Sequence, residues 1–221
     1  MSSETLPAES ARGDAKRRAI LDVGREIFLA QGYAATSMSE IAARVGGSKG
    51  TLYNYFHSKE ELFGAFMEEI CAAQAAVYFD RLPPLGEGKS VREGLIDLGV
   101  TLLTFLLQDD DMVAAHRLVV AETGRSPEIG RLFYESGPQR GVARFTEIFR
   151  AAMSTGRIPV NDPKMVGQRL KDLVMSDVYL RRLWNVLGPV DGEMLRAHVA
   201  QSVDIFLRAF GPAADERPGA T

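Results

Sequence analysis

Residues 36–62, TSMSEIAARVGGSKGTLYNYFHSKEEL, contain the side chains whose types and spacing best suit a chemical task. From Ile41 to Lys59 this stretch has three cations and no carboxylate. Lysines, hydroxyl groups and helix N-terminal amides are the groups that bind phosphate oxygens and set the register of a protein on DNA. The sequence therefore predicts a set of DNA contacts made by Thr36, Ser37, Arg44, Ser48, Lys49, Gly50, Thr51, Tyr53, Asn54, Tyr55, His57 and Lys59.

These candidate contacts divide by the part of DNA that each could reach. We expect Lys49, Tyr55 and Lys59 to bind phosphates, where they would set the register. Thr51 and Asn54 could touch base edges in the major groove. Asn54 and His57 are equally compatible with a solvated surface.

Two short helices joined by a glycine turn must position this set. Ser37 with Glu40 forms a capping box for a helix over 38–45, and Ser48 caps a second helix over 49–56. The turn falls at Gly46 and Gly47. Apolar faces come from Ile41, Ala42, Val45, Leu52 and Phe56, which leaves the candidate contacts free to face outward. A helix pair of this kind can place its second helix in the major groove of DNA.

Helical periodicity runs through nearly the whole chain, so the predicted fold class is all-α. A capping box at Ser58 and Glu61 opens a helix over 58–79, which we expect to connect two domains. The other predicted helices are 14–31, 90–108, one beginning at Asp109–Asp111, one opening at Ser126-Pro127, 139–155, 163–187 and one from Asp191 to 210. The predicted domains are a flexible tail at 1–13, a helix-turn-helix domain at 14–60, a second helical domain at 61–210 and a flexible tail at 211–221.

Composition limits the function classes. With 46% hydrophobic and 25% charged residues, the 221-residue chain suits an ordinary globular protein. The net charge of −3 does not favour nucleic acid, so DNA binding must rest on a local patch. Cys71 is the only cysteine, which excludes an intramolecular disulfide. The start of the chain has no apolar signal region, and Val100–Leu107, the longest apolar run, is too short to span a bilayer. We expect a cytoplasmic protein with no membrane partner.

The order of residues in the helix-turn-helix stretch resembles the DNA-binding signature of TetR/AcrR-type transcriptional repressors. The resemblance covers about residues 14–63 and rests on Ile41-Ala42, Gly46, Ser48–Tyr53, Tyr55-Phe56 and Ser58–Phe63. It implies a homodimer in which an N-terminal three-helix DNA-binding domain precedes a C-terminal helical bundle for ligand binding and dimerisation. Gly47 departs from the pattern, because the family usually has an apolar residue before the serine, and the turn loses a packing contact.

A weaker resemblance covers part of the second half of the chain. Ala121-Glu122, Pro127–Arg131, Phe133–Glu135 and Gly137-Pro138 are similar to the AefR-like C-terminal domain of some of these regulators. That group is associated with efflux and signalling control, which is only a hint about the ligand.

The second domain is expected to bind a mostly apolar small-molecule effector and a second copy of the chain. The helix over 90–108 is apolar nearly all round and should be central and buried. Around it, the predicted pocket residues are Leu102, Phe105, His116, Phe133, Phe145, Phe149, Met153 and Met175, which would equally suit a plain core. The predicted dimer contacts are Tyr179, Trp184, Val199, Val203, Phe206 and Phe210.

The preferred function is a ligand-responsive repressor that binds a palindromic double-stranded DNA operator as a homodimer. The effector would tilt the helix over 58–79 and change the spacing of the two recognition helices. The alternative is a helical-bundle enzyme or carrier with an incidental helix-turn-helix. Against an enzyme, the three histidines are scattered and no nucleophile motif or glycine-rich phosphate loop is present. His116 follows Asp109–Asp111 without a second His or Cys nearby, so no metal or other cofactor is expected.

Overall fold

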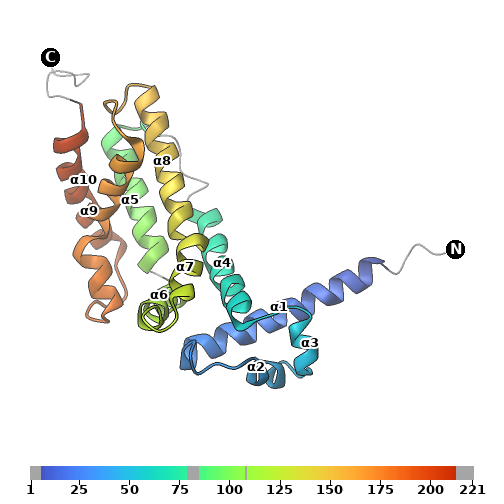
Figure 1. Cartoon of the computed structure of the whole chain (residues 1–221). Helices are drawn as coiled ribbons and strands as arrows, with labels where there is room; N and C mark the ends of the chain where they lie inside the picture. The colour runs from blue at the N-terminus through green and yellow to red at the C-terminus, as the bar shows by residue number, and fades with distance from the viewer. Residues whose placement is uncertain (1–5, 79–84, 108, 213–221) are drawn as a thin grey trace, which may run out of the picture. The chain divides into compact units, whose positions relative to one another are not determined.

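The computed structural model describes residues 6–78, 85–107 and 109–212, and within these ranges the secondary structure is helical with no strand. Figure 1 shows the helices in chain order. They are α1 (Leu6–Gln31), α2 (Met38–Arg44), α3 (Lys49–Tyr53), α4 (Lys59–Tyr78), α5 (Val91–Leu107), α6 (Asp110–Glu122), α7 (Pro127–Ser136), α8 (Pro138–Ser154), α9 (Pro163–Leu183) and α10 (Gly192–Phe210). The all-α prediction is confirmed, and no helix in the described ranges is long and apolar enough to cross a membrane.

The first helix begins earlier than its sequence periodicity indicated. It starts at Leu6 rather than near residue 14, so residues 6–13, predicted as part of a flexible tail, are helical. Pro7 suits the first turn, where a missing N–H breaks no hydrogen bond. At the other end the amide of Gly32, at φ +86°, donates to the Phe28 carbonyl at 3.0 Å. Residues 1–5 and 213–221, also predicted as tails, lie outside the described residues.

The first of two compact units contains Met1–Cys71 and Ala114–Ser136. Its core includes an aromatic cluster in which the ring centroids of Phe28 and Phe63 are 5.2 Å apart, as are those of Tyr33 and Phe63. Phe66 also stacks on Phe28, with ring centroids 6.1 Å apart. This cluster fixes the C-terminal end of α1 against α4, and the helix-turn-helix begins from that point.

The second unit contains Ala72–Val113 and Gly137–Thr221, and α5 has the predicted central place in its core. Eight of the 17 residues of α5 are buried. Gly99 lets this helix approach closely, because a Cβ atom there would lie 2.6 Å from Val199 of α10 and 3.2 Å from Val174 of α9. Ser90 and Glu93 form a reciprocal capping box at the start of α5, with amide hydrogen bonds of 3.1 and 3.2 Å.

Helix α9 is interrupted within the range that the sequence predicted as one continuous helix. Ser176 has the non-helical angles φ 23° and ψ −136°. Helix α10 supplies hydrogen bonds beside this kink: the Ser202 hydroxyl donates to the Leu173 carbonyl at 3.1 Å, and His198 Nε2 donates to the Val174 carbonyl at 2.9 Å. Side chains from another helix thus satisfy carbonyls that a straight α9 would use internally.

Candidate nucleic-acid interface

Serine caps begin the two helices of the helix-turn-helix, as the sequence predicted. The Ser37 hydroxyl accepts from the Glu40 amide at 3.2 Å, and the Ser48 hydroxyl accepts from the Thr51 amide at 3.0 Å. In a complete capping box the Glu40 carboxylate would accept from the Ser37 amide. Here it accepts instead from Gln31 Nε2 at 2.8 Å. The caps fix where α2 and α3 begin, so they also fix which side chains occupy the first turn of α3.

Burial of two anchors orients α3. Leu52 and Phe56 lie in the core of the first unit, with 2% and 1% of their surfaces exposed. The helix is shorter than the predicted 49–56, ending at Tyr53, because the Tyr55 amide bonds to the Leu52 carbonyl at 3.0 Å in a tighter turn. With the anchors facing inward, α3 presents its remaining side chains to solvent.

Most of the predicted DNA contacts are at least partly exposed, on α2, on α3 or on the residues beside them. The exposed members are Ser37, Arg44, Ser48, Lys49, Gly50, Tyr53, Asn54 and His57, and the half-buried members are Thr51 and Tyr55. The Lys49 ammonium lies 5.9 Å from the centre of the Tyr53 ring. Arg44 pairs with Glu26 at 3.1 Å on an exposed surface, where such a pair is weak enough for a phosphate to compete with it.

Two predicted contacts are directed inward instead. Thr36 is buried, and its hydroxyl donates to the Gly32 carbonyl at 2.7 Å. The half-buried Lys59 donates through its ammonium to the carbonyls of Tyr33 and Thr36, at 2.8 and 3.0 Å. Both side chains thus hold the loop between α1 and α2. The Thr36 side chain thus faces this loop and not the outer surface, and Lys59 has one N–H donor left for a phosphate.

The pKa values of two groups beside this lysine, Tyr33 and Glu60, are shifted. The Tyr33 hydroxyl donates to the Glu60 carboxylate at 2.9 Å. Burial, and then the hydrogen bond to Glu60, raises the pKa of Tyr33. Hydrogen bonds from its own backbone amide and from the hydroxyls of Ser58 and Tyr33 lower the pKa of Glu60. Glu60 therefore stays ionised and keeps Tyr33 in place beside the Lys59 ammonium, which lies 4.2 Å from the centre of the Tyr33 ring.

Sequence reasoning missed two cations of α1 that lie beside the helix-turn-helix. The Lys16 ammonium donates to the Val45 carbonyl at the end of α2, at 3.2 Å. The Arg17 guanidinium carbon lies 5.0 Å from the centre of the Phe56 ring, just after α3. The run of basic residues at 16–18 was the signal that could have found them.

The eight predicted pocket residues are divided between the two units. His116 and Phe133 belong to the first unit and contact each other edge to face, with ring centroids 4.8 Å apart. The other six belong to the second unit. Four of these six are buried in its core (Leu102, Phe145, Phe149 and Met153), and the two partly buried ones are Phe105 and Met175.

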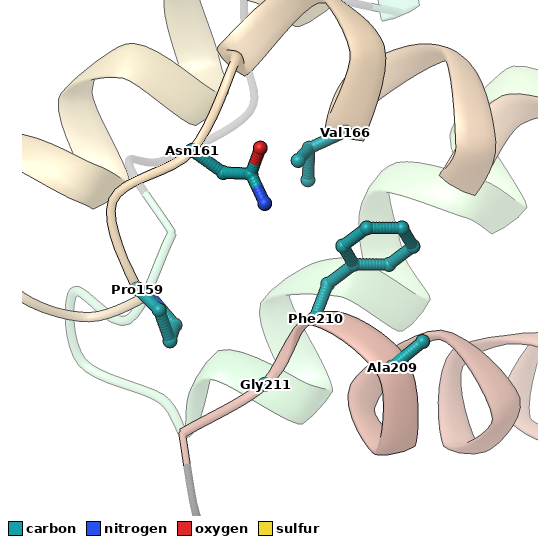
Figure 2. Close-up of a pocket in the computed structure, with 6 residues that line it drawn as sticks. All are labelled: Pro159, Asn161, Val166, Ala209, Phe210 and Gly211. Carbon is teal, nitrogen blue, oxygen red and sulfur yellow. The ribbon is translucent and has the colours of Figure 1, made fainter.

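A pocket in the second unit is lined by different residues. Figure 2 shows it between the loop after α8 and the end of α10. Its volume is about 90 Å³. Its lining consists of Pro159, Asn161, Val166, Ala209, Phe210 and Gly211. The volume is well below the roughly 300 Å³ at which pockets for drug-sized ligands begin.

Three predicted dimer contacts belong to the core of the chain itself. Val199, Val203 and Phe206 are fully buried, because α10 packs these side chains against α5, α8 and α9 of the same chain. Tyr179 and Phe210 are half-buried, and burial raises the pKa of Tyr179 to about 12. Only Trp184, with 68% of its surface exposed, is a free apolar side chain among the six.

Potential metal ligands do not cluster in the described part of the chain, which contains no group of three or more His, Cys, Asp or Glu side chains that could hold a metal ion. Asp109 instead caps the start of α6, where its carboxylate accepts from the amides of Asp111 and Met112 at 2.9 and 3.2 Å.

Comparisons with known proteins agree with this geometry. Residues 20–66 match the family described as bacterial regulatory proteins, tetR family, and residues 93–212 match the C-terminal domain of AefR-like transcriptional repressors. A transcriptional repressor of Mycobacterium tuberculosis, Rv1474c, is 29% identical over 83% of this chain and 95% of its own length. Such relatives are regulators of transcription and not enzymes.

Solved structures of similar sequence have the same fold. A putative tetR-family regulator from Mesorhizobium loti has a TM-score of 0.79 at 28% identity, covering 91% of this chain and 99% of its own. The flavonoid-responsive regulator FrrA has a TM-score of 0.79 at 29% identity, covering 91% of this chain and 100% of its own. The likeness therefore extends over both units.

Proposed function

Because the chain belongs to the TetR family of transcriptional regulators and has an AefR-like C-terminal domain, we propose that it is an effector-responsive repressor that binds a palindromic operator as a homodimer. The observation that carries the proposal is the outer face of α3. Lys49, Tyr53 and Asn54 are exposed there, on a helix whose inner anchor Leu52 is buried. Such a face offers charge for phosphates and amide or hydroxyl groups for base edges.

Exposed apolar side chains of α9 and α10 support the homodimer. Trp184, the residue that caps the end of α9, and Val186, just after it, have 68% and 66% of their surfaces exposed, and Leu180 within α9 has 43%. Ile205 of α10 is also exposed at 47%. Of these, Leu180, Trp184 and Val186 lie together near the end of α9, and exposed apolar side chains grouped in this way favour a partner surface. A second copy would bring two recognition helices to half-sites about one DNA turn, ~34 Å, apart.

Sedimentation tests the homodimer. The wild-type chain should sediment as a dimer at micromolar concentration, and Trp184→Glu should shift it to monomer while leaving its helix content unchanged. Ser154→Glu, at an exposed position of α8, is the matched charge control. A wild-type protein that sediments as a monomer would rule out the homodimer.

The core of the second unit supports a mostly apolar effector. Buried Phe145 and Met153 and half-buried Met175 are flat or flexible side chains that can repack around a ligand. Buried charge is sparse there, so a highly charged effector would lose its hydration without a partner. The similarity to a regulator described as flavonoid-responsive favours a flat aromatic effector. In this proposal the effector opens space by moving core side chains.

Selection from a random DNA pool tests the repressor function. The purified protein should enrich a palindrome, and fluorescence anisotropy with that palindrome then measures its affinity. Flavonoids should raise the melting temperature of the protein and release the DNA, because a ligand that binds only the folded state stabilises it. If only polyanions or metal ions stabilise the protein, the apolar effector is excluded while DNA binding still stands.

A further inference from the structure

Two consecutive cations of α1 contact the chain on either side of α3. Before α3, the Lys16 ammonium donates to the carbonyl of Val45, the residue that closes α2, at 3.2 Å. After α3, the Arg17 guanidinium carbon lies 5.0 Å from the centre of the Phe56 ring. All of these residues belong to the first unit, and Figure 1 shows α3 beside α1. The element that faces DNA is thus held from α1 at both ends.

A five-residue helix needs such external contacts. Helix α3 spans Lys49–Tyr53, which is little more than one turn. Helices much shorter than about 12 residues are marginal in water, because the cost of the first turn is not repaid by further hydrogen bonds. The orientation of α3 therefore depends on what its flanking residues contact.

Gly47 explains why a lysine can reach the turn. A Cβ atom built at Gly47 would lie 3.8 Å from Lys16 Nζ, 3.9 Å from Lys16 Cε and 4.0 Å from the Thr51 Cβ. A side chain at this position would therefore begin in ordinary van der Waals contact with Thr51 and with the end of Lys16. TetR-type signatures usually have an apolar residue here, and in this chain the end of the lysine lies beside the place where that side chain would begin.

The chemistry of the contact suits a cation. Val45 lies at the C-terminal end of α2, where unpaired carbonyls carry partial negative charge. A charged donor to such a carbonyl forms a stronger hydrogen bond than a neutral one. Lys16 is only half-buried, so its ammonium keeps contact with water through its other N–H groups.

We propose that Lys16 is a positioning residue for operator recognition: its hydrogen bond to Val45 replaces the missing side chain of Gly47 and holds the turn before α3, while Arg17 holds the chain after it. Lys16 acts through α3 and not through a phosphate. This proposal rests on the operator binding proposed above, so the affinity of the wild-type protein for the selected palindrome is measured first. Failure of the wild type to bind would concern that function and not the role of Lys16.

The test uses Lys16→Ala, the double variant Lys16→Ala/Gly47→Val, and Arg18→Ala as a matched control. Arg18 lies on the same helix and has the same charge, but it pairs with Asp22 and Glu69 at 3.1 and 2.8 Å. Lys16→Ala should weaken operator binding about fivefold, as expected for one lost hydrogen bond. Gly47→Val should restore most of that affinity in the double variant, because a valine would rebuild the packing contact. Arg18→Ala should stay near the wild-type affinity.

The dependence of affinity on salt separates positioning from direct contact. The slope of log affinity against log salt should be the same for Lys16→Ala and the wild type. A slope smaller by about one unit would mean that Lys16 binds a phosphate and would overturn the proposal. Absence of rescue by Gly47→Val, in a double variant whose melting temperature is that of the wild type, would overturn it as well.

Discussion

The two units bury the side chains of their key helices to opposite degrees. In the first unit, helix α3 buries only Leu52 and exposes most of its other side chains. In the second unit, α5 buries eight of 17 residues and is enclosed by its neighbours. Substitutions on the exposed face of α3 should leave the fold intact, whereas most substitutions in the core around α5 should lower stability. The following predictions test this difference, starting with the largest effect.

The largest effect is expected at Phe206 in the core of the second unit. Its ring is fully buried, and its centroid lies 5.8 Å from that of Phe149. Phe206→Ala should lower the free energy of unfolding by ~3–5 kcal/mol, because it removes a large apolar group and leaves a cavity. Urea denaturation at fixed protein concentration measures this change. Gln201→Ala, at an exposed position of the same helix, should have a much smaller effect. A loss of dimer without a loss of stability in Phe206→Ala would place Phe206 at a subunit interface.

A smaller effect is expected where α5 approaches its neighbours. In Gly99→Ala the new methyl group would lie only 2.6 Å from the Val199 side chain. This overpacking should destabilise the protein by ~1–3 kcal/mol. Gly141 of α8 is the matched control, because a Cβ atom there meets nothing within 4 Å. Gly141→Ala should stabilise the helix by up to ~1 kcal/mol. Equal melting temperatures for the two variants would contradict the close packing of α5.

Substitutions at two lysines of the first unit, Lys49 and Lys59, should distinguish a lysine that binds DNA from one that stabilises the fold. Lys49→Ala should lower the salt slope of operator binding by about one unit and leave the melting temperature unchanged, because its exposed ammonium is free to bind a phosphate. Lys59→Ala should instead lower the free energy of unfolding by ~1–3 kcal/mol, because two carbonyls lose a charged donor. Salt titrations and thermal melts measure both quantities. The reverse pattern would assign Lys59 to the DNA surface.

The smallest effect is expected at a helix cap. Ser37→Ala removes the acceptor for the Glu40 amide and should cost ~1 kcal/mol of stability. Ser39→Ala, at an exposed position inside α2, should cost nothing, because alanine is the better helix former there. If the two variants melt at the same temperature, the Ser37 cap contributes little.

Local patterns were sufficient to predict much of the first unit. The caps at Ser37 and Ser48 and the inward anchors Leu52 and Phe56 all follow from neighbours within about four residues, and the structure has each of them. Glycines also marked chain reversals correctly, since Gly32 and Gly46 both adopt positive φ angles that favour glycine. Helix ends and helix faces depend on short-range hydrogen bonds and on periodicity, which a sequence displays directly.

Contacts between distant residues could not be predicted in this way. Lys59 turns inward because carbonyls 23 and 26 residues away lie within its reach. Val199, Val203 and Phe206 are apolar in any arrangement, and only the positions of α5, α8 and α9 decide that they fill the core of their own chain. The kink at Ser176 occurs where Ser202 and His198 of another helix hydrogen-bond to the carbonyls just before it.

The sequence by itself therefore determined that this is an all-helical regulator with a serine-capped helix-turn-helix and an exposed face around Lys49 and Tyr53. The tertiary structure alone decided that Lys59 turns inward, which apolar side chains stay exposed, and that Lys16 lies against Gly47. The physical reason is the range of the interactions. Caps and helix faces form between residues a few positions apart, whereas burial and long-range hydrogen bonds depend on which helices fold against each other.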